Sequence, residues 1–354
     1  MTHNIVVVHP GALGDVLLSL TAIRWIKSSF PTHHLILVCR SDVGELLRIC
    51  GEINATISID SQFLSDLYCP HHEWAEVTSK VLFSCERLVC WLNDSDGNLW
   101  RNLQDYGVSE IIIQSPYDSN LYEQSMEDRY LESLLCWPLD SKSVKEKFQI
   151  YDNADKSLRP FKDSIKPTES GFSTIAIHPG SGSLHKCVHP SLLATVATQL
   201  KLHTNARLLI MSGPADEVSV NTFCDLLPED SYEVIEGKPL TSIVHRLLKC
   251  DLYIGHDSGL THLAAACGIP SVVLFGPTDP NKWAPRGRFV SVIQGKSCEC
   301  ADWSMIRTCQ DQPCLDISTD LIVEESIRQL TQSASVEYAS IVTGRWPHIH
   351  NLPD

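Results

Sequence analysis

The sequence lacks any apolar run long enough to cross a membrane. No uninterrupted apolar stretch in its 354 residues approaches the roughly 18 residues that a membrane-spanning helix needs. The N-terminus has no basic segment, no apolar segment behind it and no cleavage site, so we expect no signal peptide. These absences predict a cytoplasmic protein with at most peripheral contact with a membrane.

Basic charge is scarce as well. Lys and Arg number 28 against 43 Asp and Glu, and the formal net charge is −15. A surface with this balance repels polyanions, which argues against nucleic acid as a partner. The familiar phosphate-loop signatures are also missing, both the Walker A lysine motif and the GxGxxG fingerprint. ATP hydrolysis and NAD chemistry are therefore disfavoured.

Short β-branched runs alternate with helical stretches along the chain, which is typical of an α/β fold with parallel sheets. Each half opens with an apolar strand that runs into His-Pro-Gly, at His9 and at His178. We therefore predict two Rossmann-like domains, over residues 1–165 and 172–318. A C-terminal helix and tail follow over residues 319–354, with the option of packing back on the N-terminal domain. Residues 151–171 are rich in Asp, Lys, Ser and Pro and are the expected linker.

A first helix is expected from residue 16 to residue 30, where Pro31 ends it. The expected strands cover residues 5–8, 35–39, 56–59, 87–92 and 110–113 in the first half, and 174–177, 207–211, 232–235, 251–255, 271–275 and 289–293 in the second half.

The most informative stretch covers residues 251–280, which read as a strand, a polar turn, a helix and a second strand. Ser258 can cap the helix, and Gly259 lets a ligand approach the backbone closely. The helix N-terminus would then hold a phosphate or diphosphate, with Asp257 beside it and His262 one turn further along. An ordinary strand–helix–strand unit with a polar cap is the alternative.

Further polar turns are expected at the same edge of the second sheet, because parallel sheets bind ligands at the carboxyl ends of their strands. Ser181, Ser183 and Lys186 suit phosphate oxygens, since two offer hydroxyl groups and the third a mobile positive charge. Glu217 suits ribose hydroxyls. Solvated loops at the strand ends are the competing interpretation. If these turns instead bind a ligand, the hydroxyl groups, the lysine and the carboxylate at this edge of the sheet predict a nucleotide-sugar site.

In the first half, Gly14 and Asp15 follow the end of the first strand, where a helix begins. The carboxylate of Asp15 is either an ordinary first-turn residue favoured by the helix dipole or a general base. Transfer of a sugar to an alcohol needs a base for the acceptor hydroxyl and electrophilic help for the departing diphosphate. Asp15 and Lys186 would supply these from the two sides of an interdomain cleft.

Here the chain resembles glycosyltransferase family 9, the ADP-heptose:lipopolysaccharide heptosyltransferase family of GT-B architecture. The matching segments span roughly residues 5–330 and are GALGDVLL at 11–18, HPGS at 178–181 with Lys186, GPADE at 213–217, and DSGLTHLA to FGPT within 257–278. The resemblance implies two Rossmann-like domains facing each other across a cleft. It also implies an inverting transfer that needs no metal, with Asp15 as base.

By motif position, the resemblance assigns the diphosphate to five residues: Ser181, Ser183, Lys186, Ser258 and Gly259. It assigns the ribose to Glu217, the sugar or its surroundings to Asp257, and support of the phosphate turn to His262. The donor would be ADP-heptose or a related nucleotide-sugar. The acceptor would be a lipopolysaccharide core or another surface glycan, free or lipid-linked, at the inner face of the cytoplasmic membrane.

The chain departs from this family at two places. Thr21 stands where the family usually has Pro, and Lys186-Cys187-Val188-His189-Pro190 stands where it usually has Lys-x-Trp-Pro. Two other functions stay open: a GT-B-like nucleotide-sugar epimerase or hydrolase, and a non-catalytic nucleotide-sugar-binding subunit. The acceptor stays open too.

Two remaining patterns could suggest metal. Asp94-Ser95-Asp96 has the DxD form, but Gly97 follows it and we expect a turn. Most of the 14 cysteines should be thiols in a cytoplasmic chain. Four of them, Cys298, Cys300, Cys309 and Cys314, could bind zinc or iron. Because Cys-x-Cys is not the usual knuckle spacing, we expect no bound metal there and no cofactor requirement.

Overall fold

A computed structural model describes residues 3–117, 124–137, 158, 172–287, 289–300 and 302–343. The expected linker at 151–171 lies outside these residues, apart from Leu158. The chain divides into two compact units. The first contains Met1–Ser164, Pro239–Val244 and Pro280–Pro285, and the second contains Ile165–Lys238, His245–Asp279 and Arg286–Asp354.

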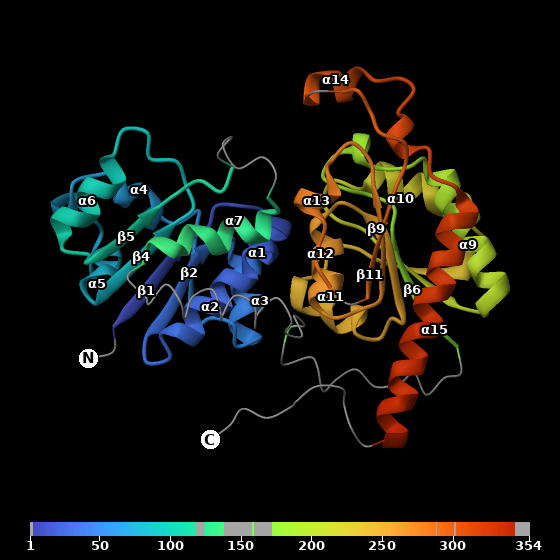
Figure 1. Ribbon diagram of the computed structural model, residues 1–354, viewed down its shortest axis with the longest axis horizontal. Coiled ribbons are helices and arrows are strands. Elements are labelled where there is room, and N and C mark those ends of the chain that lie inside the picture. The colour runs from blue at the N-terminus through green and yellow to red at the C-terminus, as the bar shows by residue number, and fades with distance from the viewer. Residues whose placement is uncertain are drawn as a thin grey trace. The chain divides into compact units, whose positions relative to one another are not determined.

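The first unit is built on a five-stranded parallel sheet in the order β3-β2-β1-β4-β5 (Figure 1). Its strands are β1 (Asn4–Val8), β2 (His34–Cys39), β3 (Ala55–Ser58), β4 (Cys85–Cys90) and β5 (Glu110–Ile113). Its helices are α1 (Leu13–Leu18), α2 (Leu20–Ser29), α3 (Ser41–Ile49), α4 (Gln62–Leu67), α5 (Glu76–Phe83), α6 (Asn98–Tyr106) and α7 (Met126–Ser133). The chain moves outward from β1 to β3 and then returns to β4 on the other side of β1, as in a Rossmann fold.

Alternate residues of these strands face opposite sides of the sheet, and both sides are buried. Val6 and Val8 of β1 pack with Phe63 of α4, Leu82 of α5 and Leu103 of α6 in one core. Because no side of the central strands meets water, they consist of continuous apolar runs rather than alternating ones. These continuous apolar runs are the pattern from which the strands were predicted.

The second unit contains a six-stranded parallel sheet in the order β11-β10-β9-β6-β7-β8. Its strands are β6 (Thr174–His178), β7 (Arg207–Met211), β8 (Tyr232–Ile235), β9 (Leu252–His256), β10 (Ser271–Phe275) and β11 (Val290–Gln294). Its helices are α9 (Pro190–Thr204), α10 (Glu217–Cys224), α11 (Leu240–Leu247), α12 (Gly259–Ala266), α13 (Pro280–Trp283), α14 (Trp303–Thr308) and α15 (Thr319–Thr343). The first residues of α11 and all of α13 fall in segments grouped with the first unit. The predicted fold, α/β with two Rossmann-like sheets, is confirmed.

Helix α15 packs within the second unit, against α9 and against strands β9 and β10. Its residues Ile322 and Val323 are buried in the same core as Ile254 of β9 and Leu200 of α9. The apolar face of α15 therefore completes the core of the second unit, and the suggested return of the C-terminal helix and tail to the N-terminal domain stays a prediction. The tail from residue 344 lies outside the described residues.

The predicted helix over 16–30 is in fact two helices, α1 and α2, separated at Ser19. The buried hydroxyl of Ser19 donates a hydrogen bond to Val16 O at 2.8 Å, which competes with the regular helical pattern. Helix α1 already begins at Leu13, a buried residue. Gly14 and Asp15 therefore lie inside the first turn of a helix rather than ahead of it.

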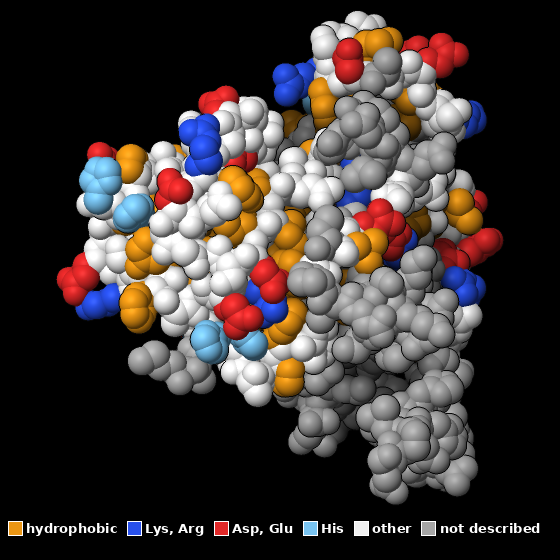
Figure 2. All heavy atoms as spheres, turned by 60° about the vertical axis from the view of Figure 1, so that its left-hand side comes forward, with side chains coloured by type: hydrophobic (Ala, Val, Ile, Leu, Met, Phe, Trp, Pro, Cys, Tyr) orange, Lys and Arg blue, Asp and Glu red, His pale blue; other side chains and the backbone are white. Residues whose placement is uncertain are grey.

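The described surface carries charges of both signs. Figure 2 shows acidic and basic side chains interspersed over the visible face, with no broad area of one charge. Among the described residues, no helix combines the length and the apolar character that crossing a bilayer would require.

Candidate functional site

The candidate donor site lies at the carboxyl edge of the second sheet, where the strand order reverses. Strands β6 and β9 are neighbours there, and successive connections leave them in opposite directions. In open α/β sheets such a switch point leaves a crevice outside the strand ends. The turns that follow β6, β9 and β10 all end at this edge, as the sequence predicted.

Asp257 holds these turns together. Its Oδ2 accepts hydrogen bonds from Lys186 Nζ at 2.7 Å and from Thr278 Oγ1 at 2.9 Å. Its main-chain carbonyl accepts one from Ser181 Oγ at 2.7 Å. His262 Nε2 lies 4.0 Å from the other carboxylate oxygen. Four side chains from the turns after β6, β9 and β10 thus surround one buried aspartate, which the sequence had assigned to the sugar or its surroundings.

Lys186 is not a free cation in this arrangement, since its ammonium group is paired with Asp257. Its side chain keeps 21% of its surface exposed. An ammonium group has three donors, so Lys186 can hold Asp257 and still donate to two ligand oxygens. Its Nζ also lies 5.8 Å from the ring centre of Trp303 on α14. The sequence did not indicate Trp303, because the contact joins residues far apart in the chain.

The N-terminus of α12 is built as predicted. Ser258 is its N-cap, and its Oγ accepts the amide proton of Thr261 at 3.4 Å. Gly259 is the first helical residue, half-buried behind the cap. The first amide groups of a helix have no intrahelical acceptors, so this end can bind an anion.

A buried pair, His178 and Asp216, supports the turn after β6. His178 Nε2 lies 2.7 Å from Asp216 Oδ2, and its Nδ1 lies 3.2 Å from Ser258 Oγ. The same Asp216 oxygen accepts the amide proton of Gly213 at 2.7 Å. A Cβ atom on Gly180 would stand 2.2 Å from Asp216 Oδ1, so only glycine fits there. The pair therefore ties the turn after β6 to the loop before α10 and to the cap of α12.

Burial alone would raise the pKa of Asp216. The hydrogen bond and positive charge of His178, with the Gly213 amide, outweigh burial and hold that pKa below its usual range. The sequence predicted no role for Asp216 and assigned the ribose hydroxyls to its neighbour, Glu217. Glu217 is exposed on the first turn of α10, and its carboxylate has no hydrogen-bond partner within the described part of the chain. The ribose role of Glu217 stays a prediction.

Ser183 is placed at the same edge but contributes its backbone. It is half-buried, and its carbonyl oxygen accepts the amide proton of Lys186 at 3.0 Å. This bond closes the short 3-10 turn Leu184–Lys186, which brings the lysine to Asp257. The predicted contact of the Ser183 hydroxyl with phosphate is still a prediction.

His256 lies under the site and is neutral. Its Nε2 accepts the amide proton of Val188 at 3.1 Å, so the proton is on Nδ1, which faces Gly180 O at 3.3 Å. Burial, followed by the charge of His178, lowers the pKa of His256 to about 4. The imidazole therefore joins two backbone segments without carrying charge.

This burial predicts a pH-dependent stability. The unfolded chain binds a proton at His256 below its ordinary pKa of 6.5, whereas the folded chain does so only near 4. Stability is fully present above about pH 6.5 and is lost as the pH falls to about 4, by about 3 kcal/mol for this residue. Urea unfolding at about pH 7.5 and about pH 5 measures the loss. In His256→Gln the difference between the two pH values should shrink by about 2 kcal/mol.

The matched control is His203→Gln, which removes an exposed histidine from α9 in the same unit. It should keep the pH dependence of the unmodified protein. An unchanged pH dependence in His256→Gln would contradict the buried neutral state.

In the first unit, Asp15 lies at the carboxyl end of β1. Its Oδ2 accepts the amide proton of Ala12, the residue before α1, at 3.1 Å. Nearby, His9 is buried, and its Nδ1 accepts the amide proton of Gly11 at 3.1 Å. Burial lowers the pKa of His9 to about 4, so it is neutral. The histidines of the two His-Pro-Gly turns therefore make different contacts. His9 packs against the rings of Trp91 and Tyr130, whereas His178 bonds to the carboxylate of Asp216.

Two tyrosines accompany Asp15. Tyr117 keeps 49% of its surface exposed, but desolvation of its phenol raises its pKa, and the negative charge of Asp15 and a hydrogen bond with it raise this pKa further. Burial also raises the pKa of Tyr130, again with Asp15 contributing. Both phenols are therefore protonated at neutral pH, and Tyr117 can donate to the carboxylate and orient it. The sequence did not indicate these two residues.

The remaining acidic motif is a turn, as predicted. The two carboxylate oxygens of Asp94 accept the amide protons of Leu99 at 3.1 Å and Trp100 at 2.9 Å. Asp94 therefore caps the start of α6.

Comparisons with known proteins agree with this geometry. The model of glycosyltransferase family 9 (heptosyltransferase) matches residues 124–309, more than half of the chain. The lipooligosaccharide heptosyltransferase 2 of Campylobacter jejuni subsp. jejuni serotype O:2 is 24% identical over 228 residues, which is 61% of this chain and 68% of that protein.

Solved structures share the fold. A glycosyl transferase family 9 protein from Veillonella parvula aligns with a TM-score of 0.70 at 17% identity, over 93% of this chain and 98% of that one. The ADP-heptose lps heptosyltransferase II of E. coli aligns with a TM-score of 0.63 at 19% identity, over 94% and 100%. With the family model spanning the second sheet and its switch-point turns, the chain belongs to glycosyltransferase family 9, the heptosyltransferase family, and is a glycosyltransferase.

Proposed function

We propose that the protein transfers a heptose from ADP-heptose, or a closely related sugar from a nucleoside diphosphate, to a hydroxyl group of a lipopolysaccharide core or another surface glycan. The observation that carries this proposal is the convergence of Lys186, Thr278 and Ser181 on Asp257 beside the N-terminus of α12. That edge offers positive charge, hydroxyl groups and unpaired amides together, which is what a diphosphate requires. The E. coli relative named for ADP-heptose has the same fold.

In this proposal the second unit binds the donor. Lys186 and the amide end of α12 stabilise the charge that develops on the departing diphosphate, so no metal is required for that step. Glu217 accepts from the ribose hydroxyls, and Ser181, Ser183, Ser258 and Gly259 line the diphosphate. Asp257 and His262 keep Lys186 and the turn in place.

The first unit supplies the base. Asp15 takes the proton of the acceptor hydroxyl as its oxygen attacks the anomeric carbon and the bond to the diphosphate breaks. A single displacement of this kind inverts the anomeric configuration. The acceptor is a glycan, free or lipid-linked, reached from the cytoplasm at the inner face of the membrane.

Calorimetric titration with ADP, UDP and GDP tests the donor assignment. We expect ADP to bind most tightly, and Lys186→Ala to weaken its binding by about 1.5–3 kcal/mol, roughly 10- to 150-fold, because a charged hydrogen-bond donor is lost. Lys249→Ala is the control, since it removes an exposed lysine just before β9, at the opposite edge of the sheet. Equal ADP affinity in the Lys186→Ala and Lys249→Ala variants would remove Lys186 from the site. Tighter binding of UDP or GDP than of ADP would contradict ADP-heptose as the donor but not the assignment to the family.

A further inference from the structure

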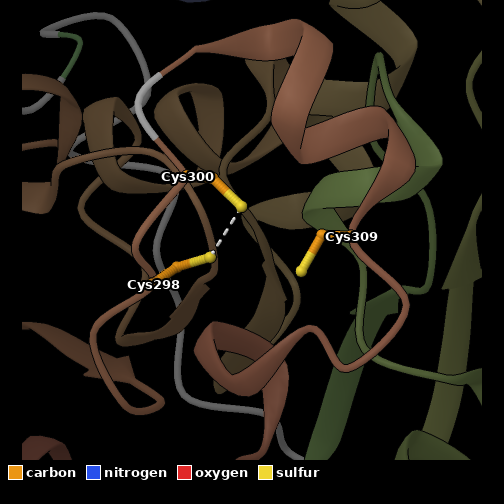
Figure 3. A group of neighbouring side chains, drawn as sticks. All are labelled: Cys298, Cys300 and Cys309. Carbon is orange, nitrogen blue, oxygen red and sulfur yellow. Dashed lines mark hydrogen bonds between the residues drawn. The ribbon is translucent and has the colours of Figure 1, made fainter.

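A cluster of cysteine thiols stands apart from the donor site, in the loop that joins β11 to α15. The sulfur atoms of Cys298, Cys300 and Cys309 all lie within 4.8 Å of one another. Figure 3 shows the three side chains directed toward a common point, two from the segment after β11 and one from the end of α14. The loop carrying them projects beyond the second sheet, with α14 at its tip (Figure 1).

A fourth thiol adjoins the group. Cys314 is 4% exposed, and its thiol adjoins that of Cys298. Cys314 lies on the 3-10 turn Pro313–Leu315, where the loop returns to the unit. The four cysteines thus come from three separate parts of the loop.

The backbone is shaped to bring the two ends of this loop together. Gly295 donates to Cys314 O at 3.2 Å, and Lys296 donates to Pro313 O at 3.0 Å. A Cβ atom on Gly295 would stand 2.6 Å from Cys314 O, so the close approach of the two strands requires glycine there. The thiols meet because the main chain is paired beneath them.

Apolar packing holds the end of the loop, where Cys314, Leu315 and Ile317 join the core of the second unit, but does little to hold its tip. Helix α14 has no buried residue, and its Trp303 and Met305 are 41% and 46% exposed. A long loop without a core of its own usually needs another cross-link to adopt a single structure. A disulfide does not supply it in this structure, because the closest pair of sulfurs, Cys298 and Cys300, is 3.0 Å apart. A disulfide bond is about 2.05 Å long.

We propose that Cys298, Cys300, Cys309 and Cys314 bind one transition-metal ion, zinc or ferrous iron, through four thiolates. Metal–sulfur bonds of about 2.3 Å in a tetrahedron place the sulfurs about 3.8 Å apart. That distance lies between the 3.0 Å that separates Cys298 from Cys300 and the 4.8 Å within which the sulfurs of Cys298, Cys300 and Cys309 all fall. Four soft sulfur donors without a carboxylate select these ions over calcium or magnesium. With four protein ligands the ion has no open position for a substrate, so its role is structural. It fixes the loop that carries Trp303.

Elemental analysis of the full-length protein, purified under reducing conditions without chelator, tests this site. We expect about one equivalent of zinc or iron per chain, and the element found distinguishes the two ions. Cys309→Ser should lower the content at least about fivefold, because one of four ligands is lost. Cys69→Ser, which alters an exposed cysteine of the first unit, should retain the full content.

A second measurement covers the case in which the serine variant does not fold. Cobalt added to metal-stripped, unmodified protein should produce the intense thiolate-to-cobalt charge-transfer absorption of a four-sulfur site. Far less than one equivalent of metal together with no cobalt absorption would overturn the proposal. So would a Cys298–Cys300 disulfide in the freshly purified protein, detected by mass spectrometry.

Discussion

Replacing Asp15 by alanine is expected to lower the turnover of sugar transfer by about 10²- to 10⁴-fold, the usual contribution of a general base. Without the carboxylate, no side chain of α1 can take the proton of the acceptor hydroxyl. Donor affinity should change by less than about 0.5 kcal/mol, because the Lys186 and Asp257 cluster belongs to the other unit. The measurement pairs a transfer assay using the preferred nucleotide-sugar with ADP calorimetry.

Asp15→Asn separates base catalysis from helix capping. In the unmodified protein the amide of Ala12 donates to Asp15 Oδ2. The side-chain oxygen of asparagine can still accept this hydrogen bond, but asparagine cannot take a proton from the hydroxyl group of the acceptor sugar. We expect it to be as inactive as the alanine variant yet more stable, by about 0.5–1 kcal/mol. Asp42→Ala is the matched control, since Asp42 is an exposed first-turn acid on α3 of the same unit. Near-full activity in Asp15→Ala would eliminate the base assignment, whereas donor turnover without acceptor would favour a hydrolase.

Asp216→Ala is expected to destabilise the second unit by about 1–3 kcal/mol, the cost of leaving a buried polar group without its hydrogen-bond partner. The substitution leaves His178 without its 2.7 Å partner and the Gly213 amide without an acceptor. The space against Gly180 also empties, so the turn after β6 loses its support. Urea unfolding of the second unit measures the loss.

Glu217→Ala provides a direct comparison at the adjacent position. Glu217 is exposed and unsupported by contacts within the described residues, so its removal should change stability by less than about 0.5 kcal/mol. It should weaken ADP binding if the carboxylate meets the ribose. The pair of variants therefore separates a structural acid from a ligand-binding one. Comparable stability in the two would show that the His178–Asp216 bond contributes little.

The lowered pKa of Asp216 gives this pair a pH signature. A carboxyl with a depressed folded pKa contributes stability above its unfolded value, and that stability is lost as the pH falls through the folded value. The stability difference between the unmodified protein and Asp216→Ala should therefore narrow in acid. His256 loses its contribution in the same direction from about pH 6.5 downward.

Local patterns were sufficient for the sheets and for the donor turn. Strands β5, β7, β8 and β10 begin and end where their apolar runs predicted, because a buried parallel strand needs apolar residues on both faces. Ser258 caps α12 as predicted, because an N-cap depends on residues within one turn. The interruption at Ser19 was missed, since the apolar period continues across it while the hydroxyl bonds backward.

What this sequence determined by itself is the α/β class, the switch-point turns and the family, all of which depend on residues close together in the chain. The tertiary structure alone decided which polar groups meet. His178 bonds to Asp216, Lys186 reaches Asp257, and the loop cysteines converge on one point. These partners are distant along the chain and are selected by burial, which makes an unpaired polar group costly. The periodicity of apolar residues indicates which face of a helix or strand is buried, but it does not indicate which side chain from another element packs against that face.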